Sequence, residues 1–258
     1  MSLRAGLRFL TVLPLAYDAA ESRVAPAATL VWFPVIGLAV GVPVYAALLL
    51  PIPAFPRAAL ALALWVGLTG GLHEDGFMDC ADAAFAPVPR ERRLEILKDP
   101  RAGAHGVTAG TLLLLLRFSA LAVVPATAAL VAPVLGRWVM ALSLAWSRPA
   151  RADGLGARFA AGARPFAPTL AMLVLLALLA GVSFGAGTVP GRAGVGPAPA
   201  LPAVGPVRLA AALIAAAVFG GGTATLLSRR FGGLTGDGHG AAGLVAEAAA
   251  LFAFVPVG

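Results

Sequence analysis

The stretch from Gly70 to Phe85 reads GGLHEDGFMDCADAAF, and it places four acids and a histidine within ten residues. Nearly all residues before it, from Thr29 to Leu72, are apolar. Carboxylates beside a hydrophobic run are costly unless a cation compensates their charge. The stretch therefore predicts a polar, cation-dependent site at the edge of an apolar helical protein.

The composition places that helical protein in a membrane. Of its 258 residues, 60% are hydrophobic and only 12% are charged, whereas soluble domains carry roughly 25% charged residues. The net charge of +7 is almost all arginine, but aromatic residues are not interleaved with the basic ones. We therefore exclude nucleic acid as a partner and assign the basic residues to lipid headgroups and an anionic substrate.

The apolar runs predict an all-α, polytopic transmembrane helix bundle that forms a single integral membrane domain over residues 1–258. A span needs about 20 apolar residues. Seven segments meet or approach this length: Thr29–Leu50, Arg57–Leu72, Val107–Val124, Ala128–Trp146, Pro168–Val189, Arg208–Leu227 and Gly240–Val257. Residues 1–15 begin with basic residues and a short apolar run, as a signal peptide does, but they lack a cleavage site. We expect them to form a retained interfacial helix.

The charges select one orientation for these spans. With the N-terminus in the cytoplasm, 14 of the 19 basic residues and 11 of the 12 acids fall in cytoplasmic segments, as the positive-inside rule requires. The outer loop, residues 190–207, contains mainly glycine and proline. This places the polar motifs, including a motif loop over residues 73–106, at the cytoplasmic face. Polar groups at one membrane edge favour an enzyme over a transporter, in which they would lie near the midplane.

Three aspartates in the opening stretch are spaced for one helix face. Asp75, Asp79 and Asp82 stand at i, i+4 and i+7, and a helix with 3.6 residues per turn brings them into one row. Like charges in a row repel unless a cation lies among them, and oxygen ligands without cysteine favour Mg²⁺ or Mn²⁺. These aspartates are the predicted metal ligands. The alternative is a solvated helix start that binds nothing.

The segment RERRLEILKDPRAGAHG, from Arg90 to Gly106, adds basic residues to the acids. Divalent metal beside basic groups makes a site for a diphosphate, with Lys98 and Arg101 as substrate-binding residues and Asp99 as a candidate catalytic residue. The alternative is an amphipathic helix that contacts anionic lipid. His73 and His105 are both candidate general bases, because imidazole titrates near neutrality.

Further polar residues occur in the second half of the chain. The run FGGLTGDGHGAAG, from Phe231 to Gly243, offers backbone N–H groups and Asp237 to a phosphate, a metal or a ribose hydroxyl, although a flexible turn also explains it. Arg117 and Arg137 interrupt predicted spans. Each either extends to the membrane boundary or faces a cavity that holds an anion, and Glu247 is a possible partner for both.

Several of these motifs, in the same order, resemble the cobalamin synthase family, the adenosylcobinamide-GDP ribazoletransferases. The stretch from Gly70 to Phe85 is similar to that family's G-G-x-H-x-D-G-x-x-D-x-x-D signature. The likeness continues through LRFLTVLP, FPVIGLAVG, RRLEILKDPRAGAHG, SRPARADGLG and GGLTGDGHGA, so it covers nearly the whole chain. The sequence departs from the family pattern at Glu74, Pro100 and Leu244.

The resemblance implies an enzyme of cobalamin biosynthesis in the bacterial inner membrane. Its substrates would be adenosylcobinamide-GDP and α-ribazole or the 5′-phosphate of α-ribazole, its cofactor Mg²⁺, and its second product GMP. The aspartate spacing also resembles the CDP-alcohol phosphotransferases, which provide the alternative of a lipid enzyme. A transporter is a more distant alternative, and homo-oligomerisation is left open.

Overall fold

The structure is a computed structural model that describes residues 3–16, 26–151, 154–186 and 205–256, and its regular elements there are all helices. In chain order these are α1 (Leu3–Leu10), η2 (Pro26–Trp32), α2 (Phe33–Leu48), α3 (Ala54–Thr69), α4 (Leu72–Phe85), α5 (Arg90–Ile96), α6 (Ala104–Val123), α7 (Ala128–Trp146), α8 (Leu155–Ala160), α9 (Phe166–Ala186), α10 (Pro206–Ala215), η3 (Ala216–Gly220), α11 (Gly221–Phe231) and α12 (Gly236–Phe252). The only β-type hydrogen bonding in these ranges is an isolated bridge between Pro149 and Leu234. The all-α prediction is confirmed.

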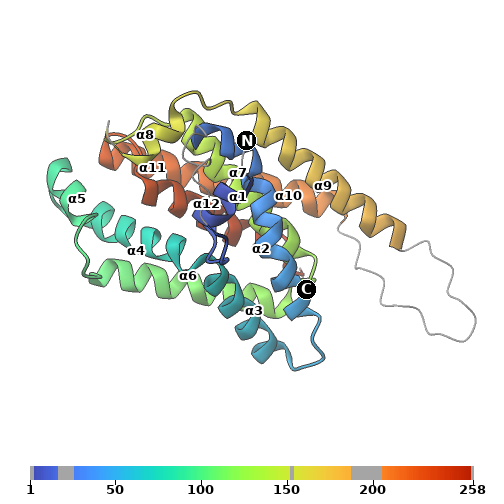
Figure 1. Cartoon of the computed structure of the whole chain (residues 1–258). Coiled ribbons are helices and arrows are strands. Elements are labelled where there is room, and N and C mark those ends of the chain that lie inside the picture. The colour runs from blue at the N-terminus through green and yellow to red at the C-terminus, as the bar shows by residue number, and fades with distance from the viewer. Residues whose placement is uncertain (1–2, 17–25, 152–153, 187–204, 257–258) are drawn as a thin grey trace, which may run out of the picture.

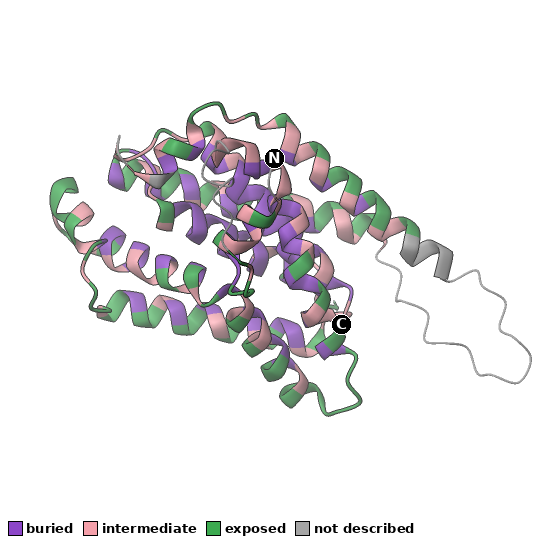
Figure 2. Ribbon diagram, in the orientation of Figure 1, coloured by how far each residue is buried: buried purple, intermediate pink, exposed green. Residues whose placement is uncertain are grey.

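Helix α7 lies in the middle of the bundle, with α2 and α12 packed along it (Figure 1). Glycines let α2 approach closely: a Cβ at Gly41 would lie 3.2 Å from the Cα of Leu130, and one at Gly37 would lie 2.6 Å from the carbonyl carbon of Pro133. Small residues at such contacts are typical of helix packing in membranes. Figure 2 shows the buried residues concentrated in this central part, with exposed residues on the outer helices.

Four helices in the described ranges are long and apolar enough to cross a membrane, and a fifth span is obtained if α3 and α4 count as one bent pair. The four are Pro26–Leu48, Ala104–Val123, Ala128–Trp146 and Pro206–Phe231. The expected number of seven is therefore not confirmed. Helix α3 has 16 residues and α12 has 17, and the apolar part described for α9 ends at Gly181. Helices α3 and α12 are therefore shorter than the roughly 20 residues that a span needs, and so is the described apolar part of α9, although α9 as a whole has 21 residues.

The first helix of the chain packs onto the bundle. In α1, Leu10 is buried together with Phe33 and Ile36 of α2, and a Cβ at Gly6 would meet the side chain of Ile36 at 2.6 Å. A helix thus forms within residues 1–15, and its interfacial position stays a prediction. Most of the predicted outer loop, residues 187–204, lies outside the described ranges.

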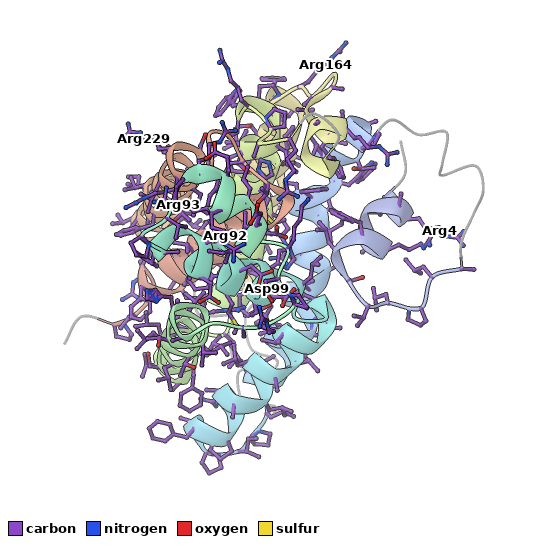
Figure 3. All side chains as sticks on the ribbon, turned by 90° about the vertical axis from the view of Figure 1, so that its left-hand side faces the viewer. Arg4, Arg92, Arg93, Asp99, Arg164 and Arg229 are labelled. Atoms are coloured by element: carbon purple, nitrogen blue, oxygen red, sulfur yellow. The ribbon has the colours of Figure 1, made fainter. Side chains whose placement is uncertain are left out.

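Charged side chains gather at the end of the molecule where α5 lies. Figure 3 looks onto this end and labels Arg92 and Arg93 of α5, Asp99 just after it, and Arg229 of α11. The aspartates of α4 lie along the helix that leads to this end (Figure 1). The polar site is therefore built where α4, α6 and α12 meet, with α5 packed against α4 and α11 beside it.

Candidate active site

Two glycines determine the direction in which the acidic helix runs. Gly70 and Gly71 have φ angles of 64° and 68°, in the left-handed region that favours glycine. They end α3 and begin α4, and the two helix axes make an angle of 86°. The bend turns α4 away from the apolar α3 so that it packs beside α6 and against α12.

A third glycine brings two of the aspartates close to α12. A Cβ at Gly76 would lie 3.0 Å from the Cα of Asp237 and 3.2 Å from its Cβ, so only glycine permits this approach. Asp75 precedes Gly76 and Asp79 follows it by one turn, and both therefore flank Asp237. Asp75 is exposed and Asp79 is half-buried. Within the described ranges, neither carboxylate has a hydrogen bond or an ion pair with a cationic side chain.

Asp237 is held at the start of α12. The hydroxyl of Thr235 accepts a hydrogen bond of 3.2 Å from the N–H of Gly238 and so caps this helix. Burial raises the pKa of the Asp237 carboxyl, and the nearby charge of Asp75 raises it further. The charge of Arg151 lowers this pKa in turn. Asp75 and Asp79, however, lie near Asp237 and have no cationic partner in the described ranges, an arrangement that a bound cation would stabilise.

Asp82, the third residue of the predicted row, already has partners. Its two carboxylate oxygens accept hydrogen bonds from the N–H of Gly103 at 2.7 Å and from the N–H of Gly106 at 2.8 Å. These N–H groups belong to the start of α6, where four backbone donors lack helical partners. Asp82 therefore caps α6 from another helix, and its role as a metal ligand stays a prediction.

The residues fit a hard divalent cation in their chemistry. The carboxylates of Asp75, Asp79 and Asp237 are oxygen donors of the kind that Mg²⁺ prefers, and Gly76 brings two helices together at the point where they meet. In the part of the chain that the structure describes, however, no group of three or more His, Cys, Asp or Glu side chains is close enough to hold an ion. The metal assignment stays a prediction.

The segment after α5 supplies the predicted anion-binding residues. Arg101 donates to both oxygens of Asp99, at 2.9 Å and 2.7 Å, and this pairing lowers the pKa of the Asp99 carboxyl to about 2. Asp99 therefore stays ionised and serves to orient Arg101. Lys98 is exposed, as is His105 at the start of α6. The His105 ring lies 6.0 Å from that of Phe85.

His105 also borders an apolar groove of about 730 Å³ between α4 and α6. Its other lining residues include Phe77, Phe85, Thr108, Leu112 and Leu116. The groove thus places an imidazole that is open to solvent beside a surface that can hold a flat apolar group.

The other predicted residues lie inside the bundle. His73 is 2% exposed and packs near Gly240 of α12. Arg117 and Arg137 are 0% and 1% exposed. The alternative in which these arginines extend to the membrane boundary is therefore wrong. Both pair with Glu247, which confirms that expected pairing. Their role in substrate binding stays a prediction, as does that of His73 in catalysis.

Comparison of the whole sequence with known protein families identifies the family of this chain. A family model described as cobalamin-5-phosphate synthase matches residues 2–255. The chain belongs to the cobalamin-5-phosphate synthase family.

Relatives in this family align with the chain over most of their length. Proteins named adenosylcobinamide-GDP ribazoletransferase from Stutzerimonas stutzeri and Pseudomonas aeruginosa are 36% and 37% identical, over 97% and 98% of this chain and 96% of each relative. A protein of the same name from Deinococcus radiodurans is 42% identical over 68% of this chain and 66% of its own length. No solved structure matches.

The structure also reveals a residue that the sequence did not single out. Arg151 lines a small polar pocket of about 130 Å³ together with Thr235 and Asp237, and it donates to the carbonyl of Leu94 at 2.7 Å. The pocket forms because the N–H of Leu234 donates to the carbonyl of Arg148 at 2.8 Å. The only signal in the sequence was that both segments are rich in glycine and polar residues.

Proposed function

We propose that the chain is a membrane phosphotransferase that joins GDP-activated adenosylcobinamide to α-ribazole, or to α-ribazole 5′-phosphate, and releases GMP. The relatives that align over nearly the whole chain carry the name adenosylcobinamide-GDP ribazoletransferase. The observation that carries the proposal is the approach of Asp75 and Asp79, which have no cationic partner in the described ranges, to Asp237 at Gly76. Arg151 lies near Asp237, and the basic residues that follow α5 in the sequence are further candidates to neutralise a diphosphate substrate.

The proposed cofactor is Mg²⁺, held by Asp75 and Asp79 of α4 and by Asp237 of α12. A bound Mg²⁺ ion supplies positive charge that stabilises the negative charge developing on the phosphate oxygens and on the departing GMP. Asp82 remains outside this set in our proposal, because both its oxygens hold the start of α6. It fixes α6 against α4 and so fixes the position of His105.

His105 is the general base that we favour. The 5′-hydroxyl oxygen of α-ribazole bonds to the phosphorus nearer the corrinoid, and the bond from that phosphorus to the GMP oxygen breaks. The hydroxyl proton must then pass to a base. His105 is exposed at the start of α6, where an alcohol can approach it, whereas His73 is 2% exposed and packs near Gly240 of α12. The apolar groove beside His105 offers a place for the flat base of the alcohol.

Lys98 and Arg101 neutralise the rest of the diphosphate charge. The exposed Lys98 ammonium is a mobile point charge, whereas the planar Arg101 guanidinium is held by Asp99 at 2.7 and 2.9 Å. A guanidinium in a fixed orientation binds phosphate oxygens with defined geometry. Asp99 acts through Arg101 and not as a proton acceptor, since its pKa of about 2 makes it a weak base.

The active end faces the cytoplasm of the bacterial inner membrane in this proposal. The basic residues counted above support this orientation through the positive-inside rule. Cysteine placed at Arg90, in a chain whose buried Cys80 is replaced by alanine, should react with a membrane-impermeant thiol reagent in inverted vesicles. Reaction only in right-side-out cells would overturn the orientation.

The experiment that tests the activity uses purified protein in lipid nanodiscs, with adenosylcobinamide-GDP and α-ribazole, with and without Mg²⁺. GMP release should require Mg²⁺ and should be lost in Asp75→Asn and Asp79→Asn. Glu91→Gln, which neutralises an exposed acid on α5, is the matched control and should keep the wild-type rate. Turnover by both aspartate variants would show that these acids are only solvated. Metal-independent transport of a corrinoid without GMP would favour the transporter alternative.

A further inference from the structure

A chain of buried charges begins at Glu74, the residue that precedes Asp75 in α4. One Arg117 nitrogen donates to Glu74 at 2.6 Å, and another lies 3.4 Å from the Glu247 carboxylate. The other oxygen of Glu247 pairs with Arg137. The chain thus joins α4, α6, α12 and α7 in that order.

Each member of this chain is removed from solvent. Arg117 and Glu247 are both 0% exposed, Arg137 is 1% exposed, and the Glu74 side chain is 13% exposed. The Arg117 guanidinium also lies 4.5 Å from the ring centroid of Trp65 in α3. Two arginines and two glutamates leave no net charge. Such a set is costly to bury, and a buried ion pair is weak evidence of added stability.

The position of these buried ion pairs indicates their role in the site. Helix α4 is held at Glu74 by Arg117, at Gly76 by its contact with Asp237, and at Asp82 by the start of α6. Asp75 and Asp79, which have no partners in the described ranges, lie between these fixed points. The contacts of Glu74, Gly76 and Asp82 therefore determine the orientation of the aspartates that lie between them.

The geometry of a helix shows how sensitive this arrangement is. A carboxylate on the helix surface lies roughly 6 Å from the axis, so a rotation of about 10° moves it by about 1 Å. A designed or natural site must hold its groups within about 0.5 Å of the productive position. Gly76 acts as a pivot close to Asp237, and the Glu74–Arg117 pair, one turn or less away, resists rotation about it.

We propose that Glu74 and Arg117 are positioning residues that set the rotation of α4, and so the affinity of Asp75 and Asp79 for a divalent cation. The inference rests on the proposed function in that it takes these aspartates as the metal ligands. It assigns the buried pair a role toward the metal without contact with it. Partners behind metal ligands commonly change affinity by about 10- to 100-fold when they are removed.

The test measures Mn²⁺ binding by electron paramagnetic resonance on purified full-length protein in nanodiscs, without substrate. In Glu74→Gln the Mn²⁺ dissociation constant should rise about 10- to 100-fold. The matched control is Glu95→Gln, which makes the same change in the exposed pair with Arg92 and should leave Mn²⁺ binding unchanged. Retention of the wild-type dissociation constant by folded Glu74→Gln would overturn the inference.

A second variant decides the matter if Glu74→Gln does not fold. Glu74→Leu combined with Arg117→Met removes both charges, and Glu247 keeps Arg137 as its partner. Replacing both members of a buried pair by apolar residues commonly preserves folding. The folded double variant should show the same weakened Mn²⁺ binding, and wild-type binding would refute the positioning role. Absence of Mn²⁺ binding in the wild-type protein would instead refute the metal site of the proposed function.

Discussion

Replacement of Gly76 by alanine tests how closely the two halves of the site must approach. The added Cβ would lie 3.0 Å from the Cα of Asp237 and 3.2 Å from its Cβ. Carbon atoms prefer separations of about 3.5–4.0 Å, so α4 and α12 must move apart by about 0.5–1 Å at this point. That displacement separates Asp75 and Asp79 from Asp237.

The expected effect on activity is larger than the effect on stability. Alanine stabilises a helix by about 1 kcal/mol relative to glycine, whereas overpacking costs about 1–3 kcal/mol. The net loss in the free energy of unfolding is therefore about 0–2 kcal/mol. A misplacement of about 1 Å between reacting groups can lower a rate by about 100-fold. We expect a folded protein with about 10- to 100-fold slower GMP release.

The assay compares GMP release per folded molecule in nanodiscs, with folding checked by size-exclusion chromatography and by thermal unfolding. Gly67→Ala in α3 is the matched control, because a Cβ there meets no atom within 4 Å. It should keep the wild-type rate and gain stability by up to about 1 kcal/mol. A Gly76→Ala protein that releases GMP at the wild-type rate would refute the close approach or its importance.

Three further substitutions test single contacts. Asp82→Asn removes one of the two acceptors that cap α6 and should lower stability by about 1–3 kcal/mol; an unchanged unfolding temperature in detergent contradicts the capping role. Asp99→Asn should leave the pH profile of GMP release unchanged between about pH 5 and pH 9, because a carboxyl with a pKa of about 2 is ionised throughout; a shifted acid limb would show that Asp99 titrates during turnover. Ser143→Ala removes the hydroxyl that lies 2.8 Å from His239 Nδ1 and leaves that buried ring unpaired. It should speed hydrogen exchange at the start of α12, and wild-type exchange there would count against this bond as a stabilising contact.

The hydropathy pattern of the sequence is sufficient to predict the long apolar helices. The predicted segment Ala128–Trp146 coincides with α7, and Val107–Val124 matches α6 to within three residues. Proline and polar residues interrupt hydropathy at both ends of these helices, so their bounds appear in the sequence. The prediction that all three aspartates share one helix is confirmed as well, since α4 covers Leu72–Phe85.

Long-range contacts were not accessible in the same way. Glu74 and Arg117 are 43 residues apart, and Arg117 and Glu247 are 130 apart. A hydropathy pattern gives no distance between such residues. The apolar residues of α12 predict a membrane span, whereas the structure shows a helix of 17 residues that is buried on most sides. Apolar composition alone does not distinguish burial by lipid from burial by protein.

The capping of α6 by Asp82 has a consequence for the chain between them. Its bonds to Gly103 and Gly106 fasten both ends of the segment that leaves α4 and returns at α6, so that this segment branches from the bundle, with α5 itself held by Arg151 and by the bond of Arg90 to Phe231. Extra length in a branch with fastened ends costs little, because closure entropy rises only with the logarithm of loop length. A fluorescent protein inserted beside the exposed Pro87 should therefore be carried without moving the helices on either side. The protein thus offers an attachment point for a reporter close to the candidate site.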